Sequence, residues 1–267
     1  LSIFFIFLFK KLKKEKKFFF FFNGWSFGFG YFLTNLYWIT ISLTFDENLN
    51  FLIPLALILI PSFLALFYGL ITFLFWLLNP KNLLSAFFIF SLLFGVIEYI
   101  RGTILSGFPW NLFVYSFSEN LSFISILSLI GTYSLNLFVI SLFTAPALYI
   151  LKKSKIDMWV CISILILPIL FLTLGTFQKQ KFLKLEETKI PFTIRIIGSN
   201  ISLDKYYNNS NTEGVINELI LLSSPTKDKK IFFLWPEVII PNTYQDEMYL
   251  YNDIFKKNFD ENHIIGL

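Results

Sequence analysis

Cysteine and histidine are scarce in this sequence, which contains one of each, Cys161 and His263, among 267 residues. A single cysteine excludes a disulfide within the chain and any metal site that needs several cysteines. A Ser-His-Asp or Cys-His catalytic site would have to use His263, which we interpret as a surface or strand-edge residue. Cys161 lies within an apolar run, where a shielded thiol is unreactive. We therefore expect no metal ion and no cofactor.

Charged residues are also few, 15% of the chain, against roughly 25% in an ordinary soluble domain. Hydrophobic residues make up 55%, and 36 phenylalanines are more than a soluble core needs. Lipid is therefore the expected solvent for much of the surface. The net charge of +4 is divided into short blocks between apolar runs rather than spread over one face, so we expect no nucleic-acid partner.

The apolar runs are long enough to predict membrane spans. A helix that crosses ~30 Å of hydrocarbon needs about 20 predominantly apolar residues. The chain begins inside such a run, Leu1–Phe9, which we interpret as a partial span cut at its N-terminus. Complete spans are then predicted at Phe18–Ile41, Phe51–Leu78, Leu83–Ile100, Leu121–Leu151 and Met158–Phe177. Residues 1–177 are thus expected to form a helical membrane domain, followed by a linker at 178–189.

Lysines occupy alternate loops between the predicted spans. They are Lys10, Lys11, Lys13, Lys14, Lys16, Lys17, Lys81, Lys152, Lys153 and Lys155. The remaining loops carry Asp46, Glu47 and Glu119, with Arg101 as their basic residue. The positive-inside rule places the lysine loops in the cytoplasm. The chain after Gln178 is therefore expected outside the cytoplasm.

Residues 190–267 have the pattern of a soluble α/β domain. Strands are predicted at Phe192–Ile197, Ile231–Trp235 and His263–Leu267, and helices at Thr212–Leu222 and Met248–Asn258. Alternating strands and helices predict a sheet covered by helices. The expected fold class is a multi-span α-helical membrane domain followed by the beginning of an α/β domain.

A carboxylate follows the second predicted strand, in the tripeptide Trp235-Pro236-Glu237. Pro236 has no N–H to donate and ends the strand. Glu237 is thereby placed where a buried strand gives way to a loop, a usual position for catalytic groups. One interpretation is a solvent-exposed loop carboxylate. The other is a general base that is partly buried against Trp235.

A second candidate site lies at the end of the span that contains Glu98 and Arg101. These residues are spaced i, i+3, so they share a helix face and can pair. The segment Ser106-Gly107-Phe108-Pro109-Trp110 follows them. One interpretation is a structural ion pair at the membrane interface, with Trp110 as an aromatic anchor. The other is a lipid-facing entrance on the same side of the membrane as the C-terminal domain.

Together these segments resemble the bacterial apolipoprotein N-acyltransferases, the membrane members of the nitrilase superfamily. The matching stretches are Glu98–Gly102 with Gly107–Trp110, Gly198–Ile201 with Lys205, and Trp235–Pro241. Weaker matches are Gly28–Gly30 with Trp38, and Ile264–Leu267. The resemblance runs over most of the chain, and the segments follow one another in the family's order.

The resemblance implies a nitrilase-like αββα domain in the periplasm, attached to a multi-pass domain in the bacterial inner membrane. It implies a Glu-Lys-Cys triad that passes an acyl chain from phospholipid to a cysteine thioester. The acyl chain then passes to the N-terminal amine of a diacylglyceryl-cysteine in an apolipoprotein. Glu237 matches the family's catalytic base, and we take Arg101, Phe108, Trp110 and Trp235 as candidate substrate-binding residues. The protein is expected to be a monomer.

The family's lysine and cysteine lie beyond the part of the nitrilase domain that this sequence contains. Lys205 follows the first strand rather than a later one, so we interpret it as a surface residue. Without that lysine and cysteine, the chain as given is expected to be inactive. Two other functions stay open. One is a different membrane-anchored nitrilase-like amidase or acyltransferase, and the other is a multi-span transporter with an accessory domain. A transporter predicts ionisable residues near the middle of the spans.

Overall fold

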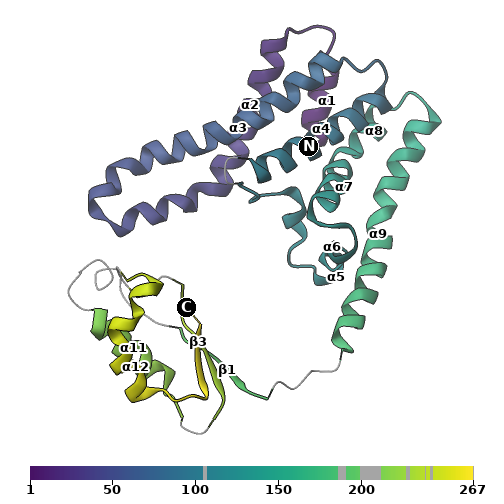
Figure 1. Cartoon of the computed structure of the whole chain (residues 1–267). Helices are drawn as coiled ribbons and strands as arrows, with labels where there is room; N and C mark the ends of the chain where they lie inside the picture. The colour runs from purple at the N-terminus through teal and green to yellow at the C-terminus, as the bar shows by residue number, and fades with distance from the viewer. Residues whose placement is uncertain are drawn as a thin grey trace. The chain divides into compact units, whose positions relative to one another are not determined.

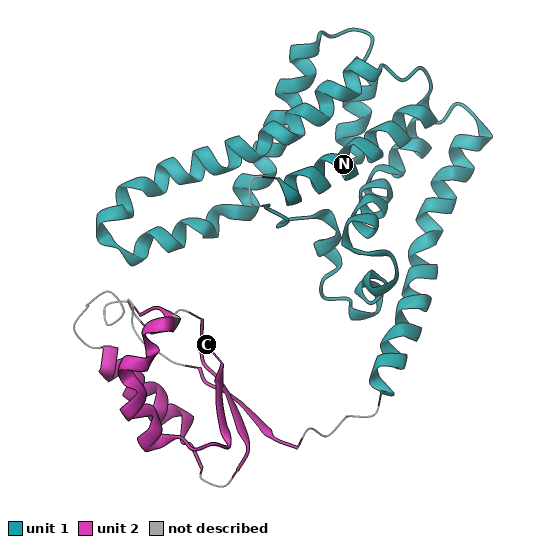
Figure 2. Cartoon of the chain, viewed as in Figure 1, with its two compact units in different colours: residues 1–185 teal, residues 186–267 magenta. Residues whose placement is uncertain are grey.

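The computed structural model describes residues 1–104, 107–185, 191–198, 212–226, 229–237, 239–240 and 243–266. The chain divides into two compact units, Leu1–Leu185 and Glu186–Leu267 (Figure 2). We describe each unit by itself.

The regular structure described in unit 1 consists of helices joined by loops (Figure 1). Its α-helices are α1 Ser2–Lys11, α2 Lys17–Leu36, α3 Ile53–Leu78, α4 Leu83–Thr103, α5 Leu121–Ile124, α6 Leu127–Ile130, α7 Thr132–Thr144, α8 Pro146–Leu151 and α9 Lys155–Leu183. Short 3-10 helices occupy Tyr37–Phe45, Glu47–Leu52 and Phe113–Phe117. Among the described residues, four stretches are long and apolar enough to cross a membrane: Glu47–Leu78, Leu83–Thr103, Thr132–Leu151 and Lys155–Leu183. This confirms a multi-span helical fold.

Two predicted spans differ from the structure. The helix at the span predicted for Phe18–Ile41 is shorter, because α2 ends at Leu36 and a 3-10 helix continues from Tyr37. Polar residues and glycines dilute the apolar content of α2, which is therefore not among the four candidates. The prediction at Leu121–Leu151 is too long, because Gly131 interrupts it. Gly131 has φ +79°, a conformation that glycine adopts without strain, and the apolar stretch begins after it.

Helices α2 and α3 pack closely through two glycines of α2. A Cβ at Gly24 would lie 2.4 Å from the backbone oxygen of Tyr68, and one at Gly28 would lie 2.8 Å from the Tyr68 Cβ. The hydroxyl of Thr72 donates a hydrogen bond to the backbone oxygen of Phe20, 2.7 Å away, which crosses the same interface. Small residues permit such close approach where water drives no helix association.

We predict that Gly24→Ala destabilises unit 1, because the added methyl group would collide with backbone atoms that cannot move alone. Overpacking of this kind costs about 1–3 kcal/mol. Thermal unfolding of the purified chain in detergent measures the change. Gly30→Ala is the matched control, since a Cβ there meets nothing within 4 Å. Equal midpoints for the two variants would contradict the close packing of α2 on α3.

Unit 2 contains a parallel sheet with the strand order β1-β2-β3. Its elements are β1 Thr193–Ile196, α11 Thr212–Ser223, β2 Ile231–Leu234, the 3-10 helix Gln245–Tyr251, α12 Asn252–Asn258 and β3 His263–Gly266. The predicted strands and the first predicted helix are confirmed to within two residues. The second predicted helix begins as a 3-10 helix and becomes α-helical at Asn252.

The two faces of this sheet have different surroundings. Ile231 and Phe233 point to one face and are buried in a core with α11 and α12, which lie on the same side of the sheet (Figure 1). The other face carries Ile194, Ile196 and Ile264, which are 45%, 77% and 64% exposed. One face is therefore covered by helices, and the other is an exposed apolar surface within this unit.

Candidate functional site

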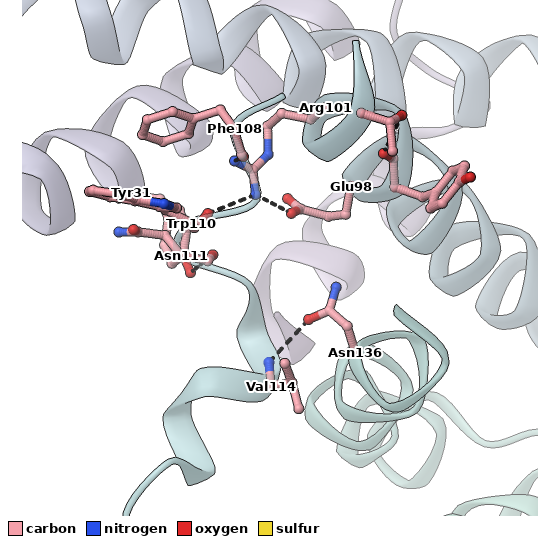
Figure 3. A network of polar contacts seen from close by, with 10 residues as sticks. Tyr31, Glu98, Arg101, Phe108, Trp110, Asn111, Val114 and Asn136 are labelled. Carbon is pink, nitrogen blue, oxygen red and sulfur yellow. Dashed lines mark hydrogen bonds and ion pairs between the residues drawn. The ribbon is translucent and has the colours of Figure 1, made fainter. Parts of the chain in front are cut away.

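Arg101 is the centre of a buried polar network at the end of α4 (Figure 3). Its side chain is 1% exposed and that of Glu98 is not exposed at all. The guanidinium donates to the Glu98 carboxylate one helical turn earlier, and it lies 5.2 Å from the centre of the Phe32 ring. Tyr68 is also buried, with 5.1 Å between the centres of its ring and the Phe32 ring. The predicted i, i+3 ion pair is therefore present and enclosed.

The same guanidinium holds the loop formed by residues 107–111. It donates to the backbone oxygens of Phe108, at 2.6 Å, and Trp110, at 3.0 Å. The backbone N–H of Phe108 in turn donates to the backbone oxygen of Arg101 at 3.1 Å. Gly107 begins the loop with φ +79°, and a Cβ there would lie 2.6 Å from the Gly102 oxygen. Only glycine fits this turn without strain.

Aromatic rings and amides complete the surroundings of the 107–111 loop. The Trp110 ring, 47% exposed, stacks on Trp38 with 5.0 Å between the ring centres. The Tyr31 hydroxyl donates to the Asn111 backbone oxygen at 2.8 Å. The Asn136 side-chain oxygen accepts from the backbone N–H of Val114 at 3.0 Å (Figure 3). Three helices thus fix the chain that follows α4.

A pocket of about 410 Å³ opens beside this loop. It is lined by Tyr31, Asn35, Asn111, Leu112, Phe113, Tyr115 and Ser116. Its wall combines aromatic rings with amide and hydroxyl groups, a combination that suits a molecule with both apolar and polar parts. Arg101 itself is not in this lining, because its side chain is buried.

The second candidate site follows β2 in unit 2. Trp235 is 5% exposed, and its indole N–H donates to the Ser223 hydroxyl at 2.9 Å. Its ring packs near Phe255 and Phe259 of the core. Glu237 is exposed. Of the two interpretations of Glu237, the structure agrees with the exposed loop carboxylate and not with a carboxylate partly buried against Trp235, whose ring packs in the core.

The remaining candidates are placed as follows. Cys161 is 1% exposed within α9. His263 lies on β3, at one edge of the described sheet, which agrees with its interpretation as a surface or strand-edge residue, and its Nδ1 accepts from the Asp260 backbone N–H at 3.1 Å. Lys205, like Ser106 and the residues 199–201, 238 and 241, lies outside the described residues. Within the described part of the chain, no three His, Cys, Asp or Glu side chains are grouped to hold a metal ion.

Comparison with known proteins settles the family. Residues 1–145, more than half of the chain, match the model of the apolipoprotein N-acyltransferase N-terminal domain. The chain belongs to this family.

Curated relatives extend the match beyond that domain. The apolipoprotein N-acyltransferase of Rhodopseudomonas palustris is 30% identical over 231 residues, which is 82% of this chain and 42% of that protein. That of Brucella melitensis is 27% identical over 226 residues, 82% of this chain and 41% of the relative. That of Rhizobium etli is 35% identical over 130 residues, 47% of this chain and 24% of the relative. The chain thus spans about two fifths of the length of the first two relatives.

Sequence reasoning found Glu98, Arg101, Phe108 and Trp110, which the structure brings together. It missed Tyr31 and Asn136, which contact the same segment from other helices. Both are polar residues inside largely apolar stretches, and such residues are costly there unless paired. That signal could have singled them out.

We predict that Arg101→Gln destabilises unit 1 by about 3–5 kcal/mol, because it leaves the Glu98 carboxylate buried without a counter-ion. Thermal unfolding in detergent measures this loss. The double variant Glu98→Gln/Arg101→Gln should recover part of the stability, since no buried charge remains. A double variant as unstable as the sum of the two single variants would contradict the coupling.

Proposed function

We propose that this chain is part of an enzyme that transfers an acyl chain from phospholipid to the N-terminal amine of diacylglyceryl-cysteine in apolipoproteins. The match of residues 1–145 to the family's N-terminal domain is the observation that carries the proposal. The relatives named apolipoprotein N-acyltransferase align with 82% of the chain, which is more than unit 1 alone. Both substrates are lipids, which accords with the apolar helices of unit 1.

The proposed reaction has two acyl-transfer steps. An enzyme thiolate attacks the ester carbonyl of the phospholipid, the bond to the glycerol oxygen breaks, and a thioester forms as lysophospholipid leaves. The lipoprotein amine then attacks the thioester, an amide forms, and the thiol is restored. A base must remove the proton first from the thiol and then from the amine. Cys161 does not suit the nucleophile's role, because it is buried in the core of unit 1, where substrates cannot reach it.

Glu237 is the proposed base. It follows β2, the central strand of the described parallel sheet, and its side chain is exposed. In open α/β sheets ligands bind at the carboxyl ends of the strands, and Glu237 stands at that edge. Trp235 lies just before Glu237 in the chain. Its hydrogen bond to the Ser223 hydroxyl and its packing in the core hold the backbone there in place. We therefore propose that Trp235 positions this turn.

In unit 1 the proposed substrate contacts are the rings of Phe108 and Trp110 and the adjoining pocket. Arg101 acts through the backbone of the 107–111 loop, which it holds with two hydrogen bonds. The proposed orientation puts this loop on the periplasmic side, since Lys10–Lys17 and the other lysine loops lie at the opposite ends of the helices. Acyl chains could then enter from the outer leaflet.

We predict that Glu237→Gln in the complete enzyme abolishes formation of the thioester, because the amide cannot accept the thiol's proton. Incubation with a phospholipid that carries an alkyne-labelled acyl chain, followed by detection of acyl-enzyme, measures this directly. Glu213→Gln, which alters another exposed carboxylate of unit 2, should retain labelling. Acyl-enzyme formed at near wild-type rate by Glu237→Gln would exclude it as the base.

The orientation predicts which residues a membrane-impermeant maleimide reaches from outside. In a Cys161→Ala background, Glu119→Cys should react in cells whose outer membrane has been permeabilised, whereas Lys13→Cys should react only after the inner membrane is opened. Mass spectrometry or gel-shift labelling measures both. Labelling of Lys13→Cys from outside would reverse the proposed topology.

A further inference from the structure

The ten lysines of the alternate loops gather at one end of unit 1. They lie on or beside the connections α1–α2, α3–α4 and α8–α9, which Figure 1 shows along the same end of the helices. The indole N–H of Trp76, near the end of α3, donates to the backbone oxygen of Glu15 at 3.1 Å. This bond joins two of the three connections. We call the set of ten lysines the lysine end.

The charge of the lysine end is scarcely neutralised within the protein. Glu15 pairs with Lys11 at 3.2 Å. Asp157 accepts hydrogen bonds from the backbone N–H groups of Lys153 and Ser154, both at 2.9 Å, and so helps to cap the N-terminus of α9. In the described part of the chain these are the acidic residues at this end, and the other nine lysines form no ion pair there. A large positive charge is left to attract an anion.

Large apolar side chains surround the lysine end. Phe18, Trp159 and Tyr149 are 65%, 60% and 56% exposed. The Lys17 ammonium lies 5.3 Å from the centre of the Phe18 ring, and that of Lys152 lies 3.8 Å from the Tyr149 ring. Aromatic rings with lysines at the ends of apolar helices are typical of the depth at which lipid headgroups lie. The anion that fits here is therefore part of a membrane rather than of a soluble partner.

We propose that the lysine end is a binding surface for the headgroups of anionic phospholipids in the leaflet at that end of the helices. Each lysine close to such a surface strengthens binding by about fivefold, and several act together here. The surface is distinct from the 107–111 loop. Lys81 precedes α4 and Arg101 lies near its other end, so about 30 Å of helix separates them. The proposal does not depend on the acyl-transfer reaction.

The test compares two lipids that differ in headgroup charge alone. The purified chain in a neutral detergent is titrated with phosphatidylglycerol or with phosphatidylcholine that has the same acyl chains, and the unfolding midpoint is followed. We expect phosphatidylglycerol to raise the midpoint and phosphatidylcholine to leave it nearly unchanged. Inorganic phosphate at equal concentration should not replace the lipid. Equal effects of the two lipids, or full replacement by phosphate, would overturn the proposal.

A matched pair of variants locates the effect. Replacing Lys13, Lys14, Lys16 and Lys17 by Gln should raise, by at least about tenfold, the phosphatidylglycerol concentration that gives half of the increase in the unfolding midpoint. Replacing Lys179, Lys181 and Lys184 by Gln, at the far end of α9, should leave it unchanged. Unaltered titration of the first variant, or loss of the effect in the second, would contradict the assignment. If the first variant does not fold, the unmodified chain is titrated at a salt concentration of about 1 M. We expect phosphatidylglycerol then to leave the unfolding midpoint unchanged, because the salt screens the lysine charges. A midpoint that still rises would contradict the proposal.

Discussion

A guanidinium buried at the end of an apolar helix must find its hydrogen-bond acceptors within the protein, and the arrangement around Arg101 follows from that constraint. Arg101 donates to Glu98 on its own helix and to two backbone oxygens of the 107–111 loop. Because the loop supplies acceptors that water cannot, it is held against α4. The half-exposed Trp110 ring and the pocket beside it depend on this attachment.

In the proposed function, lipid contact and proton transfer belong to different parts of the sequence. Unit 1 supplies the apolar helices, the aromatic 107–111 loop and, at the opposite end, the lysine end. Unit 2 supplies a parallel sheet whose central strand leads to Glu237. Charged residues in the four candidate spans lie toward their ends, as with Glu98 and Arg101 in α4 or Lys155 and Asp157 in α9. This distribution, together with the family, argues against the transporter interpretation.

Local patterns in the sequence predicted what depends on neighbouring residues. The spacing of Glu98 and Arg101 predicted their pair, and alternating apolar residues predicted the strands of unit 2. Contacts between distant residues were not predictable, since periodicity does not say which helix faces which. The bond from Tyr31 to Asn111 is an example. The Gly131 interruption was missed because hydropathy averages over a single turn. For Glu237 the sequence left an exposed and a partly buried position open, because no local rule fixes how the chain leaves Pro236.

Hydrogen exchange at the backbone of the 107–114 segment tests the central claim most directly, because the claim is that this loop is held rather than free. Mass spectrometry or NMR would compare the amides of Phe108 and Val114, which donate to the Arg101 and Asn136 oxygens. We expect both amides to exchange far more slowly than those of an unstructured chain. We also expect exchange at Phe108 to accelerate when Arg101 is replaced by lysine, because lysine cannot bridge two carbonyl oxygens and a carboxylate in the same geometry. Exchange at the unstructured rate in the unmodified protein would contradict the account.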